Sequence, residues 1–245
     1  MIEGIRLSAA GAQAQSLRHD VIANNLANVN TVGFRRQLAI LGVQGKTEAG
    51  LSLTALNPSS SPAVVATAPQ VGQGSLIQTD RGSDLALDGE GYFVVSDGRQ
   101  QFYTRAGHFD LDETGRLVTA DHRFHVEDVN GGAIEVDPSL PFTVTAGGEV
   151  VQDGTVIGRV AVVTFRDAEA LRGVGAGLLA ASGEEPSPTR LATVRQGYLE
   201  HSTVEAVREL VAMLEASRAY EANLNLITNQ DATMRRLINE AGRGV

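Results

Sequence analysis

The chain has 245 residues, with 20 basic against 29 acidic side chains and a formal net charge of −9. This acidic balance argues against a nucleic-acid-binding protein, because a negatively charged surface repels phosphate backbones. The absence of cysteine excludes disulfides, thiolate metal sites and a cysteine nucleophile. Aromatic residues are only 4% and tryptophan is absent, so a pocket lined with aromatic rings is not expected.

No secretory signal is expected at the N-terminus, because residues 1–15 lack a basic cluster followed by an apolar block. The longest apolar run, around Val160 to Phe165, has the length of a strand. It falls far short of the roughly 18 to 20 residues that cross a bilayer. We therefore expect a soluble subunit.

The first predicted element is an amphipathic helix between Leu7 and Asn28. Its seam follows an unbroken three- and four-residue spacing, at Leu7, Ala10, Ala14, Leu17, Val21, Asn24 and Asn28. We expect the helix to end between Asn30 and Gly33, because Asn and Gly accept the left-handed conformation that closes helices.

The middle of the chain changes character twice. From Gln37 to Gly74 the periodicity disappears and small residues with proline dominate, which predicts an extended linker. Short β-type runs separated by glycine-containing turns then predict a β-rich domain. Asp97-Gly98 and Asp153-Gly154 are expected in tight turns, where glycine supplies a positive φ.

The C-terminal segment predicts one long coiled-coil helix, from Val204 to Ala241. A heptad starting at Ala206 repeats its first seam position at Met213, Tyr220, Ile227, Met234 and Ala241. The companion position falls on Leu210, Ser217, Leu224, Asp231 and Ile238. A stripe sustained over five heptads needs a partner helix.

The predicted fold class is therefore α+β, with N- and C-terminal coiled-coil helices flanking a β-rich central domain. The expected divisions are an N-terminal helical assembly segment at 1–36, an extended linker at 37–75, the β-rich domain at 76–183, a return linker at 184–198 and the C-terminal coiled-coil helix at 199–245. The two seams would pack on each other or on copies of themselves.

Three segments resemble the flagellar basal-body rod and hook subunits, the family that forms the axial tube of the bacterial flagellum. They are Val21 to Arg36 (VIANNLANVNTVGFRR), Tyr103 to Asp112 (YTRAGHFDLD) with Gly115 to Thr119 (GRLVT), and Val194 to Glu200 (VRQGYLE) with Val207 to Glu209 and Ser217 to Asn223 (SRAYEAN). They reach both ends and the middle of the chain. The sequence departs from the family's usual turn at Asp121 to His125.

The resemblance implies a structural rod subunit rather than an enzyme, located in the periplasm-spanning rod of the basal body and bound to itself and to other axial subunits. The length fits the two short rod types, with the proximal subunit favoured and the distal subunit next; hook subunits are usually longer. The resemblance also implies export through the flagellar type III apparatus without a cleaved signal peptide. It implies no cofactor, no nucleic acid and no membrane insertion.

We expect both terminal segments to order together on assembly, because a lone amphipathic helix cannot bury its stripe in water. The alternative from periodicity is an antiparallel helix pair within a stable monomer. The predicted assembly interface consists of Leu17, Val21, Asn24, Asn25, Leu26, Asn28, Gly33, Phe34, Leu210, Met213, Tyr220, Leu224, Ile227 and Met234.

Several of these residues have a second reading. Asn24, Asn25 and Asn28 could fix the register between helices through amide pairing, whereas Asn28 and Asn30 equally suit helix termination. Phe34 suits either an anchor in a neighbouring subunit or local packing.

Other chemistry is weakly supported. Asp110, Asp112 and Gly115 imitate a calcium loop, but the final Glu is missing and a β-turn explains the same residues. His122 and His125 lack a third ligand at matching spacing, and the glycines at 173, 175 and 177 lack the residues of a phosphate loop. The competing class is a secreted β-domain binding protein whose helices merely dimerise.

Overall fold

The computed structural model describes residues 2–43, 62–70, 72–166, 171–175, 177–181, 183, 185–189 and 192–241. The chain divides into two compact units. Unit 1 consists of Met1–Ala27, Gln37–Ala68 and Glu205–Val245, and unit 2 of Asn28–Arg36 and Pro69–Val204. Neither helix of the described chain has an apolar stretch long enough to cross a membrane.

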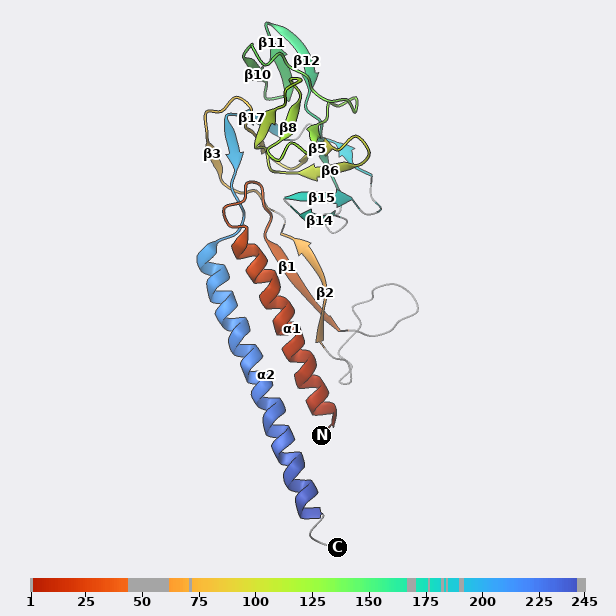
Figure 1. Ribbon diagram of the computed structural model, residues 1–245, viewed down its shortest axis with the longest axis vertical. Coiled ribbons are helices and arrows are strands. Elements are labelled where there is room, and N and C mark those ends of the chain that lie inside the picture. The colour runs from red at the N-terminus through yellow and green to blue at the C-terminus, as the bar shows by residue number, and fades with distance from the viewer. Residues whose placement is uncertain are drawn as a thin grey trace. The chain divides into compact units, whose positions relative to one another are not determined.

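Unit 1 is built around an antiparallel pair of helices, α1 (Ile2–Ala27) and α2 (Ala206–Ala241), which lie side by side (Figure 1). Gly4 lies against Gln230 and Gly11 against Asn223. The predicted arrangement of two terminal helices around a β-rich centre is confirmed. The helices pack on each other within one chain, which is the antiparallel pair named above as the alternative.

Most of the seam between the helices lies one residue away from the predicted one. On α1, Gly4 and Gly11 lie against α2, and the buried residues are Ser8, Ala12, Ala14, Ile22 and Asn25, of which Ala14 belongs to the predicted seam. Leu7 and Leu17 of the predicted seam are 50% and 40% exposed. The aliphatic residues at helical spacing therefore lie on the stripe of α1 next to the one that packs against α2.

The same shift occurs on α2. Met213, Ile227 and Met234 are half-buried, but the companion seam positions are Glu209, Ala216, Asn223 and Gln230. The predicted companions Leu210 and Leu224 are 49% and 40% exposed. Glycines on α1 explain the shift, because they leave room for amide side chains: a Cβ on Gly11 would lie 2.8 Å from Asn223 Oδ1.

Strands β1 (Gln37–Val43) and β2 (Pro62–Pro69) pair as a two-stranded sheet in unit 1, and β1 packs along α1 (Figure 1). The segment predicted as an extended linker at 37–75 therefore contains paired strands at both of its ends. The central part of that prediction, 44–61, lies outside the described residues.

Unit 2 is built from antiparallel strands. Their bounds are β3 Leu76–Gln78, β4 Leu85–Asp88, β5 Tyr92–Ser96, β6 Gln101–Thr104, β7 Phe109–Leu111, β8 Leu117–Thr119, β9 His125–Val126, β10 Phe142–Val144, β11 Glu149–Gln152, β12 Thr155–Arg159, β13 Val162–Thr164, β14 Leu171–Gly175, β15 Leu178–Ala181, β16 Ser187–Pro188, β17 Thr193–Gln196 and β18 Tyr198–Glu200.

Within the described residues, the largest sheet has the order β14-β15-β6-β5-β9-β8-β7, with β13 bridging β5 and β16. A second sheet has the order β10-β11-β12, and two further pairs are β17-β4 and β18-β3. The predicted return linker thus contributes β16 and β17 to unit 2. The C-terminal helix begins at Ala206, because the residues before it complete β18 and a short connection.

The core of unit 2 is aliphatic with a few aromatic rings. Leu85, Leu87, Phe93 and Phe109 are fully buried, and the rings of Phe93 and Phe109 meet edge to face with centroids 5.4 Å apart. Inward-facing side chains from several sheets share this core. Phe109, Leu117 and Val194 of this core belong to the segments that carry the family resemblance.

The predicted tight turn at Asp153-Gly154 is present in the structure. Asp153 and Gly154 both have positive φ, 48° and 73°, in the two-residue connection between β11 and β12. Where the family pattern is broken, His122 adopts a φ of 55°, and β8 still pairs with β9. The turn hydrogen bond from Thr119 N to Phe124 O is 2.8 Å long.

Asp112 belongs to the turn between β7 and β8, which is the reading that competed with a calcium loop. Its Oδ1 accepts hydrogen bonds from the backbone of Thr114 and Arg116 and from the Thr114 hydroxyl, at 2.7–2.9 Å. Its Oδ2 accepts from Arg116 Nε at 2.8 Å. The hydrogen bond from the Thr114 hydroxyl, followed by those from Arg116, holds the pKa of Asp112 well below 3.8.

We predict an acid-dependent effect of Asp112→Asn. A depressed folded-state pKa contributes stability above the ordinary carboxyl pKa and loses it as pH falls through the folded value. The variant should melt below the wild type at pH 7, and the difference should shrink from pH 4 towards pH 2 in thermal unfolding followed by circular dichroism. A difference that stayed constant with pH would contradict this role.

We also predict that Gly11→Leu destabilises the helix pair by about 1–3 kcal/mol, because the added side chain overpacks the seam at Asn223. Helical circular dichroism in a urea titration measures the change. Ala9→Leu, on the exposed face of the same helix, is the control and should be nearly neutral. Equal stability of Gly11→Leu and the control would show that the glycine is not required for close packing.

Candidate functional site

The three segments that carry the resemblance meet in unit 2 around one buried carboxylate, that of Glu200. The first segment contributes Gly33 to Arg36, the second contributes Arg105 to Gly107, and the third contributes Glu200 itself. We call Arg35, Arg105 and Glu200 the signature cluster. Its members are 70 or more residues apart in sequence, and the tertiary fold brings them into contact.

Backbone hydrogen bonds join the first and third segments. Gly33 N donates to Glu200 O at 2.8 Å, and Thr203 N donates to Phe34 O at 3.0 Å. Arg36 N donates to the Thr203 hydroxyl at 2.8 Å. The chain leaving α1 is thus tied, strand-like, to the chain that leads into α2.

Two glycines allow the backbone of the second segment to lie close to the first segment and to β4. Gly33 has a φ of 66°, and a Cβ there would lie 2.3 Å from the Arg105 carbonyl carbon. A Cβ on Gly107 would lie 1.5 Å from Leu85 O, with which Gly107 shares a backbone pairing. Both positions therefore require glycine, the first for its conformation and the contact, the second for the contact.

The carboxylate of Glu200 is 1% exposed and accepts from three donors. Its Oε2 lies 3.0 Å from Arg105 Nη1, and its Oε1 lies 2.9 Å from Gly74 N and 3.4 Å from Arg35 Nη2. Burying a charge is costly unless partners replace water, and these donors do so.

Arg105 has further partners. Its Nη2 donates to Gly89 O at 2.6 Å, and its guanidinium lies 5.6 Å from the centre of the Tyr92 ring. Burial lowers the pKa of Arg105, Glu200 opposes that change, and the second cation Arg35 reinforces it. Two cations therefore share one anion in a site that water barely reaches.

In unit 1, Asn25 has a structural role at the end of the helix pair. Its amide donates to Gln37 O at 2.9 Å and accepts from Gln37 N at 2.8 Å. Its Nδ2 also lies 3.4 Å from the Glu209 carboxylate, and both side chains are fully buried. Asn25 thus connects α1, β1 and α2 of the same chain.

Three other predicted interface residues also make contacts within the protomer. Gly33 and Phe34 are buried in unit 2, which agrees with the local-packing reading of Phe34. Asn28 accepts a hydrogen bond from Thr31 N at 3.1 Å, in the turn after α1. This geometry is that of helix termination.

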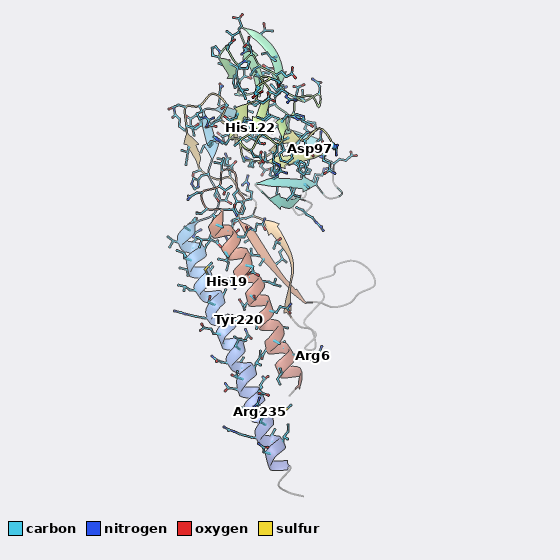
Figure 2. All side chains as sticks on the ribbon, in the orientation of Figure 1. Arg6, His19, Asp97, His122, Tyr220 and Arg235 are labelled. Carbon is cyan, nitrogen blue, oxygen red and sulfur yellow. The ribbon has the colours of Figure 1, made fainter. Side chains whose placement is uncertain are left out.

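The remaining predicted interface residues lie on the helix pair. Exposed members are Leu17, Asn24, Leu210, Tyr220 and Leu224, and half-buried members are Val21, Leu26, Met213, Ile227 and Met234. Tyr220 and His19 line a small hollow of about 390 Å³ between α1 and α2 (Figure 2). The predicted set therefore comprises an internal part and an outward-facing part.

Sequence reasoning did not identify the signature cluster. Each member lay inside a quoted segment, but nothing in one sequence pairs Arg105 with Glu200 across 95 residues. A signal was present, because charged residues within otherwise apolar segments are rarely buried unless they are paired.

We predict that Glu200→Gln destabilises unit 2 by about 3–5 kcal/mol, because two buried guanidinium groups lose their only strong anionic partner among the described residues. Glu205→Gln, which alters the exposed pair with Arg208, is the matched control and should change stability by less than about 0.5 kcal/mol. Urea unfolding compares them, and similar values for the two variants would contradict the role of the cluster.

Comparison with known families covers all three regions. Residues 5–35 match the family described as flagella basal body rod protein, and residues 86–158 match the flagellar hook protein FlgE/F/G D1 domain. Residues 195–240 match the flagellar basal body rod FlgEFG protein C-terminal family. Each member of the signature cluster falls in one of these three matches.

Relatives that match almost the whole chain indicate the same family. The chain is 31% identical to the flagellar basal-body rod protein FlgG of Bacillus subtilis, over 98% of this chain and 99% of the relative. It is 32% identical to FlgG of Caulobacter vibrioides, over 94% of this chain and 96% of the relative. FlgF of the same organism is 32% identical over 91% of both chains. The protein therefore belongs to the FlgEFG family of flagellar basal-body rod proteins and is a structural rod subunit rather than an enzyme.

Proposed function

We propose that this rod subunit polymerises through its α1–α2 pair into the axial drive shaft. One observation carries the proposal: the pair buries mainly small and polar residues in its own seam and leaves several large aliphatic residues exposed. A monomer in water gains nothing from exposed leucines on consecutive turns, whereas a contact with a neighbour would bury them.

The exposed aliphatic residues are concentrated at the start of α2. Val207, Leu210, Val211 and Leu214 are between 49% and 75% exposed, and their spacing places them along one side of two successive helical turns. On α1, Leu7 and Leu17 are also exposed. We call these six residues the outer stripe.

The pair, rather than a lone helix, is then the assembling element. Subunits related by a screw operation contact one another through different surfaces, so contacts that do not close into a ring propagate as a tube. The outer stripe of one subunit would meet another face of the next. In this form each helix has a partner within its own chain, whereas the sequence led us to expect that both terminal segments order together on assembly.

The position in the rod and the route to it are further parts of the proposal. The sequence favours the proximal rod, with export of the chain by the flagellar type III apparatus. The two FlgG relatives named above match slightly more of the chain than FlgF of Caulobacter vibrioides does; because FlgG is the distal rod subunit, this supports the distal rod as the alternative. A photo-crosslinker at Leu17 in basal bodies, followed by mass spectrometry, would identify the neighbours and so separate the two positions.

We predict that Leu214→Glu or Leu224→Glu abolishes assembly while leaving the monomer folded, because an interface cannot bury an unpaired carboxylate. Association of the purified chain with itself or with other rod subunits should fall at least about tenfold in sedimentation, which corresponds to about 1.4 kcal/mol. Swimming should be lost in a strain that carries the variant as its only copy.

The matched control is Val174→Glu, the same change at a residue of unit 2 that is 52% exposed. It should assemble and support swimming normally. Circular dichroism of all variants checks folding. Normal swimming with both helix variants would contradict assembly through the helix pair.

A further inference from the structure

Asn28–Arg36 is a short segment of unit 2 that continues into unit 1 at both of its ends. It leaves the end of α1 and leads into β1, and we call it the strap. Backbone groups of Gly33, Phe34 and Arg36 hydrogen-bond to the segment that precedes α2. The Phe34 side chain is buried, so docking of the strap also removes apolar surface from water.

The strap also carries Arg35, whose charge is not matched in the signature cluster. The side chains of Arg35 and Arg105 are 9% and 4% exposed, and both pair with the single carboxylate of Glu200. Two buried cations and one buried anion leave one positive charge in excess within the cluster. Burial of a charge without its own counter-charge is costly, and like charges repel more strongly where water is excluded.

Arg35 is held less well than Arg105. Its Nη2 lies 3.4 Å from Glu200 Oε1, whereas Arg105 Nη1 lies 3.0 Å from Oε2 of the same carboxylate. Arg105 also donates from Nη2 to Gly89 O at 2.6 Å. Among the described residues, the Nε and Nη1 atoms of Arg35 are buried without a hydrogen-bond acceptor. The protein therefore replaces little of the hydration that Arg35 loses on docking.

Release of the strap would leave the rest of the cluster satisfied. Glu200 keeps its pair with Arg105, and its Oε1 keeps the hydrogen bond from Gly74 N at 2.9 Å. The cluster would then hold one cation and one anion, and Arg35 would be hydrated. Arg35 thus opposes docking, whereas the backbone hydrogen bonds and the burial of Phe34 favour it.

We propose that the strap opens while the remainder of unit 2 stays folded, and that Arg35 sets how readily it opens. Segments whose docking is poorly compensated open at a lower free energy than the core around them. Opening lets the chain between α1 and β1 move independently of the folded part of unit 2. This property belongs to the single chain and does not rest on the proposed assembly.

The first experiment is native-state hydrogen exchange of the wild-type, full-length chain, followed by NMR. The amides of Gly33 and Arg36 should exchange at least about tenfold faster than those of Leu117 and Val160, after correction for intrinsic rates. The latter two donate backbone hydrogen bonds elsewhere in unit 2, at 3.0 and 2.8 Å. Equal protection at the four amides would overturn the proposal, because the strap would then open only when unit 2 unfolds.

The second experiment repeats the measurement on Arg35→Met, which keeps an aliphatic side chain and removes the excess charge. Exchange at Gly33 and Arg36 should slow at least about tenfold, because the docked state no longer buries unpaired guanidinium donors. Arg195→Met, which removes an exposed ion pair with Asp88, is the matched control. It should leave exchange in the strap unchanged.

The variant decides the role of Arg35 whichever way it behaves. Unchanged or faster exchange in the strap, or failure of Arg35→Met to fold, would show that Arg35 does not oppose docking and would overturn its part in the proposal. The wild-type measurement needs no variant, so it tests local opening of the strap by itself.

Discussion

The burial of Glu200 between Arg35 and Arg105 is the constraint on which much of unit 2 depends. A carboxylate that is 1% exposed must be held by donors, and the donors come from segments far away in the chain. Holding them requires Gly33 to adopt a left-handed conformation against Arg105, and the segment after α1 to pair with the segment before α2. One charged group therefore fixes three segments at once, and each of them falls in a separate family match.

The helix pair of unit 1 is held together by different contacts, those of small and amide side chains. Its seam contains glycines, alanines and amides beside Ile22, and these small residues allow the two helices to approach closely. At one end, Asn25 and Glu209 replace apolar contacts with hydrogen bonds. A polar element in a helical interface fixes register at some cost in stability. In the proposed assembly the exposed aliphatic residues contact other subunits, so that internal register and external assembly would use separate faces of the same helices.

In the proposed assembly the two units have different roles. The outer stripe of unit 1 is apolar and would be buried by contacts with other subunits, whereas unit 2 is held together internally by the charged signature cluster. Apolar contacts supply affinity with little orientation, and a buried charge pair supplies orientation. A tube built from one repeated subunit needs both, because a small angular error at each contact accumulates along the polymer.

The sequence by itself determined the two helices, the β-rich centre, the tight turns and the family. Heptad spacing, turn dipeptides such as Asp153-Gly154, and the three quoted segments are local signals that survive without tertiary information. The seam register, the strands at residues 37–43 and 62–69, and the signature cluster were decided only by the tertiary structure. Spacing alone favours leucine over glycine and asparagine at a seam, but the side that packs depends on how closely two backbones can approach, which is a property of both helices together. Likewise, no property of Arg105 alone identifies Glu200 as its partner, because that pairing exists only after the chain has folded.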